Sequence, residues 1–106
     1  MDWIRIASAN DLQDDEAVGL EVRDTRIALY RSEGEFFATA NRCTHAEAVM
    51  SEGFVEDGCI ECPLHQARFD LRTGKALCAP ATVDIKTYPV RREGDDIYID
   101  LGSAAA

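Results

Sequence analysis

The chain has 106 residues, enough for one domain with a single core and too few for two. Its 20 acidic and 11 basic residues give a net charge of −9, which argues against nucleic-acid binding because that function needs a basic surface. The negative charge is compatible with steering toward a basic partner protein, although plain solubility is the commoner reason for such a charge.

No apolar run approaches the roughly 18 residues that a membrane-spanning helix needs. The first residues also lack the basic leader and apolar stretch of a signal peptide. We therefore expect a cytoplasmic protein with no membrane anchor. In that compartment the four cysteines are expected to be metal ligands or thiols rather than disulfides.

The pattern of the chain predicts an all-β fold, a small antiparallel sandwich or barrel in one domain that covers residues 1–106. Short alternating or apolar runs recur between turn-forming residues, and helical periodicity is nearly absent. One helical turn is predicted at Ser8–Asp14 with Ser8 as its cap, and the small residues of 102–106 are predicted to fray. The predicted strands are Trp3–Ala7, Ala17–Val22, Arg26–Arg31, Glu35–Ala40, Phe54–Glu56, Cys59–Glu61, Ala67–Asp70, Ala76–Leu77, Val83–Val90 and Asp96–Leu101.

Glycine and proline mark the turns and edges of this sheet. Asp57 and Gly58 form a two-residue hairpin signal, because glycine adopts positive φ freely and aspartate does so more easily than most residues. Gly34, Gly74 and Gly94 mark further turns. Pro89 lies inside a strand-like run, which predicts an edge strand or a bulge there because proline has no backbone N–H.

Two short motifs between predicted strands carry the chemistry. Cys43 and His45 form a C-x-H motif, and Cys62 and His65 form a C-x2-H motif further along the chain. The hairpin between the motifs allows the two loops to approach each other at one end of the sheet. A thiolate and an imidazole on each of two loops are typical of a Rieske-type [2Fe–2S] site, in which two His replace two Cys on one iron.

The donor set makes the oxidised centre electrically neutral, because two thiolates balance the +2 charge of two ferric ions and two sulfides. A site with four Cys would start at −2 and would be harder to reduce, so His ligation raises the reduction potential. The imidazoles also couple electron uptake to proton uptake.

Zinc is the main alternative. Cys59 and Cys62 form a C-x2-C motif that the Cys43 and His45 pair could complete to a tetrahedral site. Against zinc, Cys59 lies in a strand pattern on the face opposite to Ile60, and His65 would have no role. The third possibility is that no metal binds, with Cys59 and Cys78 as small buried apolar residues.

From Asn41 to Pro89 the sequence resembles the small Rieske ferredoxins of bacterial aromatic-ring-hydroxylating dioxygenase systems. The matching segments are residues 41–45, 61–65, 68–76 and 78–81. The resemblance implies a cluster-binding part at about residues 41–82. It implies that Cys43 and Cys62 bind the inner iron, and that His45 and His65 bind the outer iron near the surface.

The loop around Pro80 would form a third wall over the cluster, with a simple surface turn as the alternative.

The departures from related proteins bear on the potential. Respiratory-chain Rieske proteins have a disulfide where this chain has Ala48 and Leu64, and hydroxyl side chains where it has Ala67 and Phe69. Hydroxyls that donate to cluster sulfur stabilise the reduced state, so their absence lowers the potential. We expect a value of roughly −150 mV, at the low end of the Rieske range.

The sequence argues against an oxygenase and favours a one-electron carrier. Both histidines are already assigned, so no 2-His-1-carboxylate iron site can form, and no glycine-rich dinucleotide motif is present. By the resemblance, a flavin-containing NAD(P)H-dependent reductase supplies electrons and a terminal oxygenase receives them. We expect a monomer. The alternatives are a carrier for another oxygenase or reductase, a zinc-binding interaction module, and a Rieske-like subunit that carries no electrons.

The docking surface is expected around the cluster loops, where partner contacts are small and transient. Val49 and Met50 could equally pack inward. Acidic residues Glu47, Glu52 and Glu61 could steer a basic partner. The predicted docking residues are Ala46, Val49, Met50, Leu64, Gln66 and Pro80.

Overall fold

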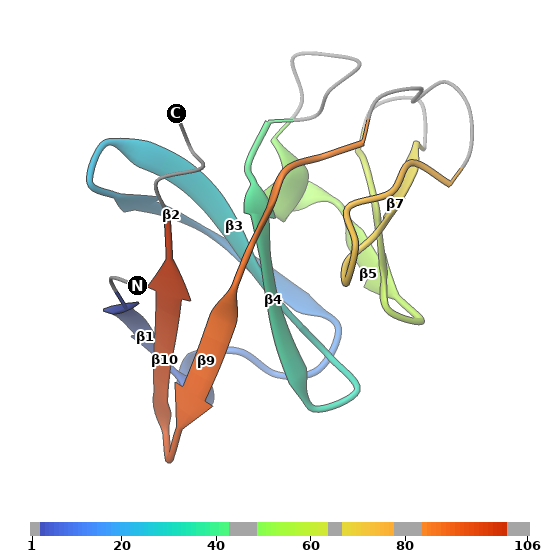
Figure 1. Ribbon diagram of the computed structural model, residues 1–106. Helices are drawn as coiled ribbons and strands as arrows, with labels where there is room; N and C mark the ends of the chain where they lie inside the picture. The colour runs from blue at the N-terminus through green and yellow to red at the C-terminus, as the bar shows by residue number, and fades with distance from the viewer. Residues whose placement is uncertain (1–2, 43–48, 64–66, 78–83, 102–106) are drawn as a thin grey trace.

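The computed structural model describes residues 3–42, 49–63, 67–77 and 84–101. These residues form three antiparallel sheets and two single turns of 3-10 helix, which confirms the all-β prediction (Figure 1). None of the described helical turns has the length and apolar character needed to cross a membrane. The elements are β1 (Trp3–Ser8), η1 (Ala9–Asp11), β2 (Glu16–Val22), β3 (Thr25–Ser32), β4 (Glu35–Ala40), η2 (Met50–Glu52), β5 (Phe54–Glu56), β6 (Cys59–Glu61), β7 (Arg68–Asp70), β8 (Thr87–Tyr88), β9 (Val90–Glu93) and β10 (Asp96–Asp100).

Strand β3 explains how the three sheets stack. Residues 27–30 of this strand are completely buried, so both of its faces are covered. Ala28 and Tyr30 pack in a core cluster with β5, β6 and β7, whereas Ile27 and Leu29 pack with β1 and β10. Successive side chains of a strand point to opposite faces. The β2–β3–β4–β8 sheet therefore forms a middle layer with a three-stranded sheet on each side.

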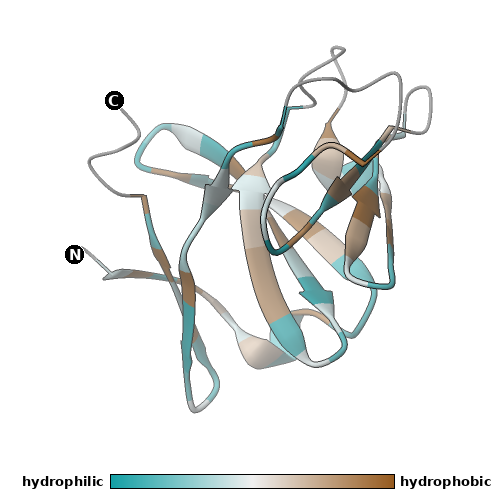
Figure 2. Ribbon diagram, turned by 45° about the vertical axis from the view of Figure 1, so that its right-hand side comes forward, coloured by the Kyte–Doolittle hydropathy of each residue, from teal (hydrophilic) through white to brown (hydrophobic). Residues whose placement is uncertain are grey.

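The hydropathy of the chain follows this arrangement. Hydrophobic residues concentrate along the middle of the strands and hydrophilic residues at the turns (Figure 2). A continuous apolar run such as residues 27–30 is typical of a strand buried on both faces. The strands of the β5–β6–β7 sheet and residues 96–99 of β10 instead alternate between buried and accessible residues, because each of these sheets has one face on the core.

The helical turn and its cap lie where the sequence predicts them, although the turn is shorter than expected. Ser8 Oγ accepts a hydrogen bond from the Asn10 amide at 3.2 Å, and Asp11 Oδ2 accepts one from the Ser8 amide at 2.9 Å. This reciprocal pair is a capping box, which satisfies backbone donors at the start of the turn. Only Ala9–Asp11 is helical, and the chain is extended again at Leu12.

The predicted strand Val83–Val90 is wrong as a single element. Residue 83 lies outside the described residues, and the rest is divided at Pro89 into β8 and β9. β8 pairs with β4 at one edge of the middle sheet, and β9 pairs with β10 at one edge of an outer sheet. Pro89 therefore marks the point where the chain passes between layers, and both flanking strands are edge strands as its missing N–H requires.

The short strand predicted at Ala76–Leu77 is reduced to an isolated bridge between Phe69 and Ala76. This bridge nevertheless extends the β5–β6–β7 sheet by one further segment. The Leu77 amide also donates to the Arg68 carbonyl at 2.8 Å, so Leu77 lies beside β7.

Candidate metal centre

Cys62 is the one predicted ligand that lies within the described residues. It follows β6 directly, and its side chain is 1% exposed. The Cys62 amide donates to the Ala67 carbonyl at 2.7 Å, which continues the β6–β7 ladder beyond the Glu61 and Arg68 pair. Cys62 and Ala67, which lie on either side of residues 63–66, are therefore held next to each other. Cys43, His45 and His65 lie outside the described residues.

The residues that flank 43–48 are also held together. Arg42 and Val49 form an antiparallel bridge, and the Met50 amide donates to the Asn41 carbonyl at 2.9 Å. The Asn41 side-chain oxygen accepts a further bond from the Ser51 amide at 2.8 Å. Asn41, which precedes the first motif, is thus hydrogen-bonded to Met50 and Ser51, which follow it.

The residues on either side of 78–83 are also held together by hydrogen bonds. The Ile85 amide donates to the Gly74 carbonyl at 2.8 Å, and the Ala76 amide donates to Asp84 Oδ1 at 2.9 Å. Gly74 has a φ of +78°, and a Cβ placed on it would lie 2.1 Å from the Ile85 carbonyl oxygen. Only glycine permits these two segments of the chain to approach so closely.

These flanking residues share one hydrophobic core. Met50, Cys62, Ala67 and Ile85 are all buried members of the cluster that also contains Phe69. The described segments beside 43–48, 64–66 and 78–83 end at the same side of the molecule, at the top of Figure 1. The fold therefore brings together the chain segments that lead to and from the two motifs.

Cys59 and Cys62 point to opposite faces of their strand. Cys62 and Ile60 are buried in the core, whereas Cys59 is half-buried on the outer face. Both are thiols rather than disulfides. Side chains on opposite faces of a strand do not converge on one ion. This arrangement counts against the C-x2-C zinc site, and the described residues contain no group of three or more donors that could hold a metal.

The alternative in which Cys59 is a small buried apolar residue does not fit the structure, because Cys59 is partly accessible. Burial is nevertheless sufficient to raise the pKa of the Cys59 thiol, and the nearby Asp70 and Asp57 raise it further, while Arg68 opposes them. Cys78 lies outside the described residues.

We expect Cys59 to react slowly with iodoacetamide near neutral pH, because the thiolate is the nucleophile and its fraction is reduced when the pKa is raised. The alkylation rate should increase with pH and continue to increase above pH 9, the usual thiol value. Mass spectrometry of Cys59 peptides from the loaded protein measures the rate. A rate that reaches its plateau below pH 8 would contradict the effect of burial.

The two positions that have no hydroxyl group, unlike the corresponding positions of respiratory-chain Rieske proteins, lie in the core around Cys62. Ala67 and Phe69 are both completely buried, and Phe69 pairs with Ile60 across the ladder. Neither side chain has a donor, so neither can form a hydrogen bond to sulfur. A buried thiol with apolar neighbours fits a thiolate ligand of an iron–sulfur cluster better than it fits an exposed reactive cysteine.

The predicted docking residues divide between surface and core. Val49 is 43% exposed and Glu52 is exposed, whereas Met50 is completely buried and cannot contact a partner. Sequence reasoning missed Phe54, which is 68% exposed. The alternation of Phe54, Val55 and Glu56 contained the signal, because an inward Val55 turns Phe54 outward. Ala46, Glu47, Leu64, Gln66 and Pro80 lie outside the described residues.

Comparisons with known proteins give the same assignment as the motifs. The family model of the Rieske [2Fe–2S] domain matches residues 2–89. The ferredoxin component of the naphthalene 1,2-dioxygenase/salicylate 5-hydroxylase systems of Ralstonia sp. is 56% identical over 93% of this chain and 95% of its own. The ferredoxin subunit of a 3-phenylpropionate/cinnamic acid dioxygenase from Shigella flexneri is 49% identical over 98% of each chain.

The fold agrees with a solved ferredoxin complex. A chain in the complex of reduced oxygenase and oxidised ferredoxin of carbazole 1,9a-dioxygenase superimposes with a TM-score of 0.85 and 31% identity, over 92% of this chain and 100% of that one. High identity over nearly the whole length, together with the matching domain, fixes the family and the cofactor. The chain belongs to the Rieske [2Fe–2S] family, among the ferredoxin components of dioxygenase systems, and is an electron carrier rather than an enzyme.

Proposed function

We propose that Cys43 and Cys62 bind one iron of the Rieske cluster and that His45 and His65 bind the other. The buried Cys62 at the end of β6 is the observation that carries this proposal. Its amide is held by Ala67 and its side chain lies in the core, so the sulfur has a fixed position. When bound, the cluster takes up and releases one electron.

We further propose that the protein receives electrons from an NAD(P)H-dependent flavin reductase and passes them to a terminal ring-hydroxylating oxygenase. The oxygenase–ferredoxin complex of the carbazole system supports the second partner. The substrates of the related systems, naphthalene and phenylpropionate, support an aromatic compound as the final acceptor of oxygen. We place this monomeric shuttle in the cytoplasm.

The chain is proposed to form a single domain over residues 1–106. Strand β3 contributes residues to all three core clusters, which links the cluster-binding side to the rest of the fold. The cluster-binding part then covers about residues 41–82, and residues 102–106, which the sequence predicts to fray, lie outside the described residues.

The test of the ligand set is an electron paramagnetic resonance spectrum of the dithionite-reduced protein. We expect an average g value below that of ferredoxins with four Cys ligands, because two neutral imidazoles replace thiolates on one iron. A red-brown solution with a reducible visible spectrum should accompany it. A colourless protein containing zinc, or a spectrum of the four-Cys type, would contradict the proposed ligands.

The midpoint potential is expected at roughly −150 mV, toward the low end of the Rieske range. Buried Ala67 and Phe69 are the reason, because both positions lack a hydroxyl that could donate to sulfur. Redox titration followed by circular dichroism measures the potential. Phe69→Tyr supplies one hydroxyl and should raise the potential, with Phe37→Tyr on β4 as the control. A wild-type value above about +100 mV, near the upper part of the range, would contradict this explanation.

A further inference from the structure

The helical turn η2 lies between the two chain segments that lead to the proposed Cys ligands. It follows the segment that contains Cys43 and His45, and β5 and β6 then lead from it to Cys62. The turn packs against β2 and β3 of the middle sheet. Its Met50 side chain is completely buried in the same core cluster as Cys62. The position of η2 therefore affects the supports of both motifs.

Asn41 fastens η2 to the chain that enters the first motif. Its carbonyl accepts a hydrogen bond from the Met50 amide at 2.9 Å, and its Oδ1 accepts one from the Ser51 amide at 2.8 Å. The Asn41 amide donates to the Arg26 carbonyl of β3 at 3.2 Å. Asn41 lies only two residues before Cys43, a distance that the chain spans with at most about 7 Å. A shift of Asn41 is therefore transmitted to the start of the first motif.

Gly19, in the middle of β2, is the residue on which the Asn41 side chain rests. A Cβ placed on Gly19 would lie 2.7 Å from Asn41 Nδ2 and 2.9 Å from Ser51 Oγ. The Ser51 hydroxyl can rotate away from such an atom. The Asn41 amide group is planar, so a displacement of Nδ2 also moves Oδ1 away from the Ser51 amide. Glycine at position 19 therefore preserves the side-chain hydrogen bond that holds η2.

The far end of η2 is confined by backbone rather than by side chains. Gly53 ends the turn, and a Cβ placed there would lie 2.1 Å from the Glu61 carbonyl oxygen. Glu61 is the last residue of β6 and directly precedes Cys62. Because a backbone carbonyl cannot rotate away, η2 cannot move toward β6 without displacing the strand that leads to Cys62. The two ends of η2 thus connect Asn41 to the support of Cys62.

We propose that Asn41, seated on Gly19, is a positioning residue for the cluster, because it fixes the entry to the first motif relative to the strand that leads to Cys62. The inference rests on the proposed function, in which one iron takes Cys43 from one segment and Cys62 from the other. A change in the spacing of the two segments has to be absorbed by the bonds to that iron. Replacing residues that orient metal ligands typically weakens metal binding about 10–100-fold.

The test measures iron retention in the loaded protein. Loss of visible absorbance follows the release of iron to a chelator, and electron paramagnetic resonance gives the g values of the reduced protein. Asn41→Ala removes the acceptor for the Ser51 amide, so it should increase the rate of iron release by about tenfold and change the g values. Gly19→Ala displaces the same amide group and should change both in the same direction. Asn41→Asp keeps an acceptor oxygen and should release iron at close to the wild-type rate.

The double variant Gly19→Ala/Asn41→Ala tests whether the two residues act together. If Gly19 acts through the Asn41 side chain, its replacement has little further effect once that side chain is absent. The double variant should therefore release iron within about twofold of the rate of Asn41→Ala alone. Independent effects would instead multiply.

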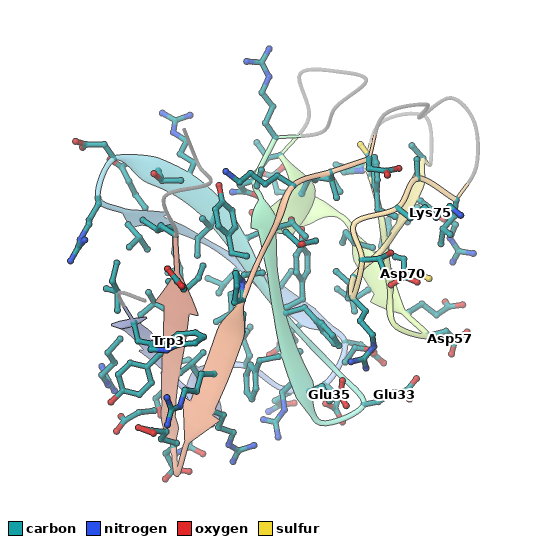
Figure 3. All side chains as sticks on the ribbon, viewed as in Figure 1. Trp3, Glu33, Glu35, Asp57, Asp70 and Lys75 are labelled. Carbon is teal, nitrogen blue, oxygen red and sulfur yellow. The ribbon has the colours of Figure 1, made fainter. Side chains whose placement is uncertain are left out.

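Gly34→Ala is the matched control for the added methyl group. Gly34 lies between Glu33 and Glu35 at the turn before β4, whereas Asn41 follows the other end of that strand (Figure 3). Its φ of +79° makes the variant less stable, but a Cβ there would have no atom within 4 Å. We expect a lower Tm with unchanged g values and with a rate of iron release close to that of the wild type.

Wild-type iron release and g values in both Asn41→Ala and Gly19→Ala would overturn the positioning role. An equal change in Gly34→Ala would also overturn it, since that would indicate a general loss of stability, as would multiplied effects in the double variant. Failure of the proposed function is a different result, in which the wild-type protein itself has no Rieske-type spectrum on reduction.

Discussion

Replacing Cys62 with Ala is expected to abolish the iron–sulfur centre completely. The sulfur of Cys62 lies in the core at the end of β6, and no second thiol faces the same side of that strand among the described residues. A thiolate that is lost from a two-Cys, two-His site leaves one iron without half of its protein ligands. Iron analysis and the visible spectrum of the purified variant measure the loss.

Cys59→Ala is the matched control for this variant, because Cys59 lies three residues earlier on the opposite face. We expect the control to bind iron as the wild type does. Each replacement removes a single sulfur atom, and the cavity left at position 62 costs only about 1 kcal/mol, so circular dichroism should show a retained β fold. Loss of metal from both variants would favour the zinc site with three Cys ligands.

Gly74→Ala is expected to produce a large loss of stability for the addition of a single methyl group. The added Cβ would lie 2.1 Å from the Ile85 carbonyl oxygen, which is backbone and cannot rotate away. Positive φ adds a further penalty of about 1 kcal/mol for a residue with a side chain. Forced displacement of packed chains adds about 1–3 kcal/mol. The free energy of unfolding should therefore decrease by about 3 kcal/mol.

Gly34→Ala separates strain from steric overlap. Gly34 has nearly the same φ, +79°, but a Cβ there would have no atom within 4 Å. We expect this control to lose about 1 kcal/mol, or roughly 4–8 °C in Tm for a domain of this size. Thermal unfolding of both loaded variants measures the difference. Equal losses would mean that the contact with Ile85 relaxes at no cost.

Much of the fold follows from local signals in the sequence. The strands Glu35–Ala40, Phe54–Glu56 and Cys59–Glu61 have the predicted bounds, and each adjoins a turn that contains Gly34 or Gly58. The hairpin at Asp57 and Gly58 has φ values of 52° and 76°, as the two-residue turn requires. The spacing of the Cys and His residues was sufficient to predict the cofactor and hence the family.

Features that depend on distant parts of the chain were not predictable in the same way. The division of residues 84–93 at Pro89 depends on which strands are available as partners, β4 for one half and β10 for the other. The turn at Arg23 and Asp24 has two positive φ values without glycine, so the local sequence does not predict its backbone conformation. Val49 and Met50 differ in burial because only Met50 reaches the core cluster.

The hydrogen bond from the amide of Cys62, the proposed ligand, to the Ala67 carbonyl has a consequence for the speed of electron exchange. A change of charge at the cluster exerts a force on every atom nearby, and atoms that shift in response add a reorganisation energy to the activation barrier. Cys62 is held by a strand ladder on one side and by packed apolar side chains on the other. A rigid, dry support of this kind limits the nuclear movement that accompanies each electron, so the sheet lowers the barrier simply by keeping its shape.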